Sequence, residues 1–189
     1  MHANEGVSAR CSDQERIVTV EVSRLLQFRI TKYDPGQRNA SGHYLRREWT
    51  SVGDIGRSFD GIVLTEAEYE RIETAYMETA VAFLRGAGVS SLVVAGLENH
   101  ADVQVSFADG DSLNLAEVKD AVGRVLREEF WCRFEGQTAF IHIGYDYYMY
   151  VGVPHSVPEA GHWRDDLGYL LKRLSHRIAC VAELNPRVS

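Results

Sequence analysis

The chain has 189 residues, a length that suits one domain with a hydrophobic core of its own. Its formal net charge of −7, from 20 basic and 27 acidic residues, argues against a general nucleic-acid-binding protein, because neutralising phosphates needs a basic face. No apolar run approaches the ~20 residues of a membrane span, and the polar start lacks a signal-peptide core. We expect a cytoplasmic protein with a flexible leader over 1–16 and a single domain over 17–189.

Cysteine and histidine usage gives no metal or disulfide signature. The three cysteines, Cys11, Cys132 and Cys180, are far apart in the sequence and form no C-x-x-C pair. The seven histidines are dispersed and show neither an H-x-x-x-H pair nor an H-E-x-x-H motif. We therefore expect no metal site and no cofactor, with Cys132 and Cys180 as buried thiols inside apolar runs.

The first sixty residues predict a strand region and a long irregular connection. Apolar and polar residues alternate over 18–33, and Asp34-Pro35-Gly36 is a turn signal. Residues 37–60 keep no sustained period, yet contain large apolar anchors such as Trp49 and Phe59. A long connection with such anchors is often a functional loop.

The middle of the chain predicts two helices separated by paired strands. Thr65 and Glu68 form a capping box before an apolar stripe that ends at Gly86 and Gly88. The apolar run 91–97 and the alternating residues 103–107 then predict a hairpin, followed by a turn over 108–112. Asn114, with Glu117 three residues later, opens the second helix.

The last third predicts further strands around a third helix. The residues Phe130–Phe134 begin a strand, and the run Phe140–Val153 is rich in aromatic and β-branched residues. Pro158 opens the third helix, and alternation over 178–184 predicts a last strand. Adjacent short strands favour an α+β fold with a largely antiparallel or mixed sheet and about three helices on one face. A doubly wound parallel fold is the alternative, which fits less well because the paired strands lack crossover helices.

The tyrosine-rich run Phe140–Val153 is the first candidate site. As one straight strand it would place His142, Asp146, Tyr148 and Tyr150 on one face and an apolar set on the other. His142 and Asp146 would then be about 13 Å apart, too far for a hydrogen bond. If 144–146 forms a turn, two short strands result. The polar face either lines a pocket or is an ordinary sheet face with its tyrosine hydroxyls in water.

The second candidate lies in the connection, around Glu48, Trp49 and Asp54. In the functional interpretation the two carboxylates face a partner or ligand, and Trp49 is a rigid apolar contact. In the structural interpretation Trp49 anchors the loop and Asp54 caps backbone amides.

Three stretches together resemble a known group of proteins. They are Ile30-Thr31-Lys32-Tyr33-Asp34-Pro35, then Glu48-Trp49-Thr50-Ser51 with Asp54-Ile55-Gly56, and Ile143-Gly144-Tyr145-Asp146-Tyr147-Tyr148-Met149-Tyr150. The chain resembles small uncharacterised bacterial cytoplasmic proteins, some of the immunity type that binds and neutralises a cognate toxin. The resemblance implies a class of function and no catalytic residue.

The leading hypothesis is a non-enzymatic binding protein of the bacterial immunity or inhibitor kind. Its acidic, aromatic surface would bind a basic, toxin-like protein, with no nucleic acid or membrane as partner. The expected binding residues are Glu48, Trp49, Asp54, Tyr145, Tyr148 and Tyr150. The alternative is a small-molecule enzyme or ligand-binding protein, in which His142, Asp146, Glu48 and Asp54 supply acid–base groups.

Overall fold

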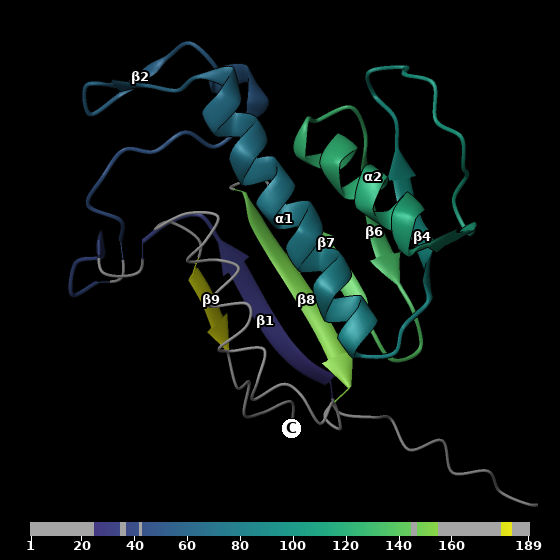
Figure 1. The fold of residues 1–189 in the computed structure, drawn as a ribbon. Helices are drawn as coiled ribbons and strands as arrows, with labels where there is room; N and C mark the ends of the chain where they lie inside the picture. The colour runs from purple at the N-terminus through teal and green to yellow at the C-terminus, as the bar shows by residue number, and fades with distance from the viewer. Residues whose placement is uncertain (1–24, 35–36, 42, 145–146, 155–178, 183–189) are drawn as a thin grey trace, which may run out of the picture.

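A computed structural model describes residues 25–34, 37–41, 43–144, 147–154 and 179–182. Across these residues the chain is an α+β fold, in which two helices pack together on one face of a seven-stranded antiparallel sheet (Figure 1). The α+β prediction is confirmed. The expected leader and the third helix from Pro158 lie outside the described residues.

The sheet has the strand order β5-β4-β6-β7-β8-β1-β9. The strands are β1 (Leu25–Thr31), β4 (Ser91–Glu98), β5 (Ser112–Asn114), β6 (Trp131–Glu135), β7 (Phe140–Ile143), β8 (Tyr148–Pro154) and β9 (Ala179–Ala182). Every pairing in the sheet is antiparallel. Strand β1 lies between β8 and β9, so an early segment of the chain joins two late ones.

The tyrosine-rich run forms the hairpin β7–β8, which resolves the alternative left open by its sequence. Ile143 pairs with Met149, and the backbone N–H of Gly144 donates to the carbonyl of Tyr148 at 2.7 Å. The turn preserves the alternation, because Ile141, Met149 and the other apolar members of the run are buried on one face.

Helix α1 (Glu66–Gly86) begins where its local signals place it. The Thr65 side chain accepts a hydrogen bond from the backbone N–H of Glu68 at 3.2 Å, and Glu66 and Glu68 put negative charge in the first turn. Its buried face carries Tyr69 and Tyr76 toward the sheet. The predicted start and the end near Gly86 are confirmed, but only the Thr65 half of the predicted capping box forms, because the Glu68 carboxylate accepts from Arg71.

Helix α2 (Leu115–Leu126) has the predicted capping box. The Asn114 side chain accepts from the backbone N–H groups of Ala116 and Glu117, and the Glu117 carboxylate accepts from the Asn114 N–H at 2.8 Å. Gly123 lies against α1, since a Cβ there would be 2.9 Å from Sδ of Met77. The two helices therefore pack tightly along this contact.

The predicted strand over 103–107 is wrong. Strand β4 pairs instead with β5 (Ser112–Asn114), which begins at the last residue of the predicted turn. The Asn99 side chain makes the hydrogen bonds that a neighbouring strand would make with the backbone of Val103. Its amide donates to the Val103 carbonyl at 2.8 Å and accepts from the Val103 N–H at 3.1 Å. Phe107 packs on Phe130 with ring centroids 5.6 Å apart. The alternating apolar residues thus pack against the core without joining the sheet.

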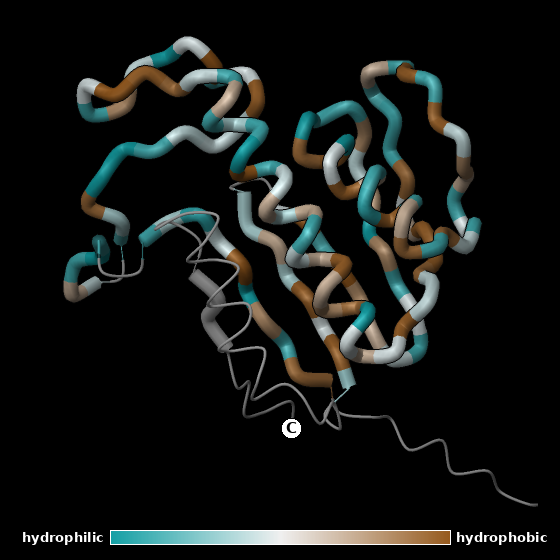
Figure 2. Tube along the Cα trace, in the orientation of Figure 1, coloured by the Kyte–Doolittle hydropathy of each residue, from teal (hydrophilic) through white to brown (hydrophobic). Residues whose placement is uncertain are grey.

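The connection 37–60 contains a short 3-10 helix, η2 (Val52–Asp54), and leads into the small hairpin of β2 (Ser58–Phe59) and β3 (Ile62–Val63). This hairpin projects away from the seven-stranded sheet (Figure 1). Figure 2 shows apolar colour in it, where Ile62 and Val63 are more than half exposed.

Candidate functional site

Trp49 is a core residue, with 6% of its surface exposed. Its ring lies 4.8 Å from the Tyr147 ring and 5.4 Å from the Tyr69 ring, measured between centroids. The 37–60 connection therefore packs against the tyrosine-rich hairpin. Trp49 therefore anchors the connection in the core, as the structural interpretation predicts, and its role as a partner contact stays a prediction.

Lys32 is buried directly beside this tryptophan. Its ammonium nitrogen lies 4.0 Å from the Trp49 ring centroid and 4.1 Å from that of Tyr33, and its side chain is 2% exposed. The Glu48 carboxylate lies 3.4 Å from the same nitrogen. Glu48 is thus engaged by a buried cation and keeps 17% of its side chain exposed.

Asp54 caps backbone amides, as the structural interpretation predicts. Its Oδ2 accepts from the N–H groups of Thr50 and Ser51 at 2.9 and 3.2 Å. Its Oδ1 accepts from the Arg57 guanidinium at 2.9 Å. The Asp54 oxygens are therefore committed to holding the η2 turn, so Asp54 is poorly placed as a general base.

His142 lies on the other side of the sheet from the helices, because its neighbours Ile141 and Ile143 are in the core. Its Nε2 is 3.4 Å from Oε1 of Glu135, and its ring stacks on Phe140 at 4.7 Å. Tyr148 and Tyr150 share this face with a centroid separation of 6.5 Å. Tyr145 and Asp146 lie outside the described residues.

Lowering the pH is expected to decrease the free energy of unfolding through the protonation of His142. Burial lowers its pKa below the ordinary value of 6.5, although Glu135 acts in the opposite direction. The unfolded chain then binds a proton that the folded chain takes up only at lower pH, so stability present above about pH 6.5 is lost as the pH falls through the folded pKa.

The check is urea unfolding of wild type and His142→Asn between about pH 7.5 and 5.5. We expect a smaller loss of stability in His142→Asn. His100→Asn removes a histidine whose side chain is 85% exposed and is the matched control. An unchanged pH slope in His142→Asn would contradict the prediction.

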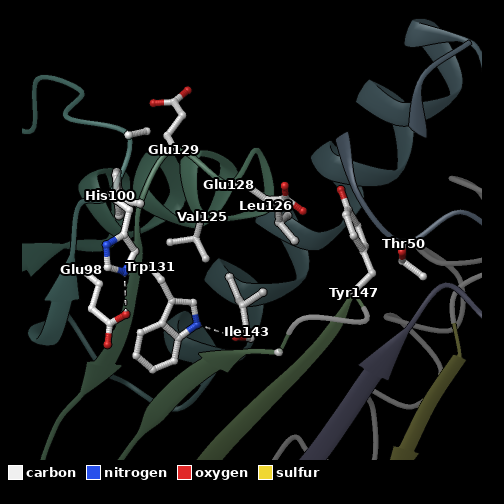
Figure 3. A pocket seen from close by; sticks show the side chains of 13 residues that line it. Thr50, Glu98, His100, Val125, Leu126, Glu128, Glu129, Trp131, Ile143 and Tyr147 are labelled. Carbon is white, nitrogen blue, oxygen red and sulfur yellow. Dashed lines mark hydrogen bonds and ion pairs between the residues drawn. The ribbon is translucent and has the colours of Figure 1, made fainter. Parts of the chain in front are cut away.

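A cavity of about 360 Å³ opens where β4, the hairpin β7–β8 and the end of α2 meet (Figure 3). Its walls combine apolar side chains with a partly charged rim. The lining residues are Thr50, Glu98, His100, Ala101, Val125, Leu126, Glu128, Glu129, Phe130, Trp131, Ile143, Gly144 and Tyr147. The volume falls within the ~300–1,000 Å³ of ligand pockets.

The rim of this cavity carries three carboxylates and no lysine or arginine. Glu98 contacts His100, with Oε2 3.1 Å from Nε2, and Glu129 accepts from Arg124 at 2.7 Å. Among the described residues Glu128 has no ion-pair partner. The neighbouring Arg127 is directed to Glu73 on α1 instead. The electrostatic field at the cavity therefore favours a cation.

Strand pairing helps to position the rim. Glu98 faces Trp131 across β4 and β6, after a register shift that begins at Ala95. Gly96 within this irregularity has φ +66, a conformation that L side chains rarely adopt. Bulges of this kind re-aim the side chains that follow them. The Trp131 indole N–H donates to the Ile143 carbonyl at 3.1 Å, which fixes the ring at the cavity.

Two cavity residues have an unfavourable backbone conformation. Glu128 has φ 59 and Tyr147 has φ 57, a left-handed region that costs a non-glycine residue about 1–2 kcal/mol. Among the described residues the only other non-glycine positions with positive φ are Asp60 and Asp102, a residue type that tolerates it. Strain of this kind concentrates at functional sites.

Replacing Glu128 with glycine is expected to leave the protein as stable as wild type or about 0.5–1 kcal/mol more stable. The N–H groups of Glu128 and Glu129 bond back to Val125 and Arg124, the pattern that usually has glycine at the first position. Glycine also removes a carboxylate from a helix C-terminus. Glu128→Ala keeps the strain and should be less stable than Glu128→Gly in urea unfolding. The reverse order would show that the conformation carries no cost.

A second cavity, of about 350 Å³, lies under the β2–β3 hairpin. It contains two of the expected binding residues, Glu48 and Trp49, but mixes the signs of charge. Its charged lining residues are Arg46, Arg47, Glu48, Asp60 and Glu68. Because basic and acidic residues both line this cavity, its charge favours neither a cation nor an anion. The first cavity is therefore the stronger candidate for a binding site.

The first cavity was not predicted from the sequence. Its charged residues are separated in the sequence, and only Thr50, Ile143, Gly144 and Tyr147 come from the two stretches that it had selected. The available signal was Arg127-Glu128-Glu129 directly after the apolar stripe of α2, where glycine is the common helix terminator.

Three further findings bear on the function. In the described ranges no three His, Cys, Asp or Glu residues are grouped to hold a metal ion. Neither described helix is long and apolar enough to cross a membrane. Comparisons of the chain with protein-family models, curated proteins and solved structures find no match.

Proposed function

We propose that this protein is a non-enzymatic binding protein of the bacterial immunity or inhibitor kind, and that it binds a basic partner protein at the cavity of Figure 3. The observation that carries the proposal is the lining itself, in which three glutamates join apolar side chains and no lysine or arginine contributes. In this proposal the partner contacts Glu98 and Glu128, and not Glu48 and Asp54, which the sequence predicted as binding residues.

The nearby arginines do not neutralise the site. Arg124 pairs with Glu129 and also donates to the Gln104 carbonyl at 2.8 Å. Arg127 makes two hydrogen bonds of 2.7 Å to Glu73. Among the described residues Glu128 therefore has no ion-pair partner, while Glu98 contacts the exposed His100. The excess negative charge at the cavity steers a basic protein toward it and speeds association at low salt.

The acid–base set of the alternative hypothesis is not assembled in the part of the chain that the structure describes. His142 is on the sheet face away from the helices, while Trp49 beside Glu48 packs on the helix side. Asp54 is held by backbone amides and Arg57. General acid–base catalysis needs such groups within hydrogen-bond reach of one substrate. This separation supports binding over catalysis.

The test is capture from a lysate of the source organism with tagged protein, at low and at raised salt. The decisive variant is Glu98→Gln/Glu128→Gln, and Glu66→Gln/Asp120→Asn is a control with the same change of charge on exposed helix positions. We expect a basic protein to be retained by wild type and the control, and lost from the Glu98→Gln/Glu128→Gln variant and at raised salt.

Equal retention by the Glu98→Gln/Glu128→Gln variant would overturn the location of the binding site. Retention of a small molecule, with no protein, would overturn the proposed function in favour of the ligand-binding alternative.

A further inference from the structure

We propose that the cavity accepts an arginine side chain, with the guanidinium group against the Trp131 indole and within reach of Glu98, Glu128 and the Tyr147 hydroxyl. The proposal deepens the proposed function and rests on it, because the arginine would belong to the basic partner. Four observations carry it: an unpartnered buried hydroxyl, the arrangement of carboxylates, an oriented indole and the size of the cavity.

The Tyr147 hydroxyl is the first observation. Tyr147 is 3% exposed, lines the cavity and has a buried hydroxyl oxygen to which no described residue donates a hydrogen bond. In Figure 3 this hydroxyl points toward the end of α2, where Leu126 and Glu128 line the same cavity. Burial raises its pKa, so the phenol stays neutral and offers a lone pair to an N–H donor. A ligand that donates there satisfies a polar group that folding leaves without a partner.

The neighbouring tyrosines explain why the chain itself does not satisfy this group. The Tyr69 hydroxyl donates to the Leu126 carbonyl and the Tyr76 hydroxyl donates to the Tyr147 carbonyl, each at 2.7 Å. Neither hydroxyl therefore has a proton left to donate to the Tyr147 oxygen. Of Tyr69, Tyr76 and Tyr147, only Tyr147 has a buried hydroxyl oxygen that accepts no hydrogen bond from the described residues.

The carboxylates come from separate elements. Glu98 ends β4, whereas Glu128 and Glu129 follow α2. Acceptors that approach from different directions match a guanidinium, which presents five N–H donors in one plane. An ammonium offers three donors from a single nitrogen and is more strongly hydrated, so it gives up more water on entering the cavity.

The indole of Trp131 supplies a surface for stacking. Figure 3 shows the ring face-on beside Glu98, with its N–H turned to Ile143. This hydrogen bond holds the ring in place at the cavity, so the side chain need not change its rotamer for a ligand to stack on it. Guanidinium groups stack on aromatic faces, with tryptophan the best partner. The volume of about 360 Å³ is at the low end for ligand pockets, which suits one long side chain.

The test is a calorimetric titration of the full chain with N-acetyl-arginine-N-methylamide. The matched ligands are the corresponding lysine derivative and the citrulline derivative, which is nearly isosteric with arginine but neutral. We expect the arginine compound to bind with a dissociation constant on the order of 1 mM, the lysine compound to bind about tenfold more weakly, and citrulline not to bind.

Two variants separate the site from general charge. Glu128→Gln should weaken arginine binding about tenfold, while Asp120→Asn on the exposed side of α2 should leave it unchanged. Tyr147→Phe removes only the unpartnered hydroxyl, so the fold should be at least as stable while arginine binding weakens several-fold. Loss of binding without loss of stability is a result that a purely structural role for the hydroxyl would not produce.

The arginine proposal fails if lysine binds as tightly as arginine, or if Glu128→Gln and Tyr147→Phe both bind arginine as wild type does. It also fails if a basic protein is captured through Glu98 and Glu128 and no arginine derivative binds, in which case the proposed function survives. If the arginine derivative binds at the cavity but no basic protein is captured, the arginine specificity of the cavity is supported and the proposed function is contradicted.

Discussion

Replacing Lys32 with alanine is expected to lower the free energy of unfolding by about 3–5 kcal/mol, the usual cost of breaking a buried charge pair. The Lys32 side chain is 2% exposed, and its ammonium nitrogen lies about equally far from the rings of Tyr33 and Trp49. Its removal leaves the Glu48 carboxylate without the cation that faces it and opens a cavity beside the Trp49 ring. Urea unfolding followed by tryptophan fluorescence measures the change.

A companion variant separates charge from packing. Lys32→Met/Glu48→Gln removes both charges and keeps most of the volume, so it should recover more than half of the stability lost in Lys32→Ala. A loss below about 1 kcal/mol in Lys32→Ala would show that the pair contributes no more than an exposed salt bridge.

Replacing Arg127 with glutamine is expected to lower the free energy of unfolding by about 2–3 kcal/mol. The guanidinium makes two hydrogen bonds of 2.7 Å to Glu73, whose side chain is 8% exposed. Without Arg127 this carboxylate stays buried between the helices and has lost its bidentate partner. The expected loss is below that of a fully buried pair, because the Arg127 side chain is 38% exposed and water screens part of the interaction.

The matched control joins the same two helices. Lys119 on α2 pairs with Glu78 on α1, with side chains 37% and 42% exposed. Lys119→Gln should cost less than about 1 kcal/mol, because both charges remain hydrated. Equal losses in Arg127→Gln and Lys119→Gln would show that the burial of Glu73 does not decide the energy of the pair. Both variants are compared by urea unfolding.

The parts of the fold that could be predicted are those whose signals are local. The helix starts at Thr65 and Asn114 follow from a side chain that satisfies backbone N–H groups within the next three residues, which needs no tertiary context. The alternation in the tyrosine-rich run likewise determines which side chains are buried, whether or not the run turns.

The parts that could not be predicted depend on long-range partners. Val103, Val105 and Phe107 alternate as a strand would, but the Asn99 side chain satisfies the backbone at Val103, and no strand forms. Sequence patterns report which side chains need burial and cannot say what buries them. Trp49 was ambiguous for this reason, because an aromatic anchor in the core and one at an interface look alike in the sequence.

The candidate cavity escaped prediction because nothing local connects its residues. Glu98 and Trp131 meet through the pairing of β4 with β6, and Tyr147 reaches the cavity from the β7–β8 turn. The sequence signal at the end of α2, glutamate where glycine is the common terminator, indicates an unusual backbone but not which residues it meets.

The placement of β1 between β8 and β9 has a consequence for biogenesis. When β1 leaves the ribosome, both of its hydrogen-bonding neighbours are still to be synthesised, since Leu25 pairs with Pro154 and Thr31 with Ala179. The segment from α1 to β8 can fold through contacts between residues that are closer in the sequence. Until β8 and β9 are available, the backbone N–H and C=O groups of β1 have no strand to pair with. Topologies of high contact order fold slowly for this reason. We therefore expect the insertion of β1 to be the late step of folding and the interval in which the nascent chain most needs a chaperone.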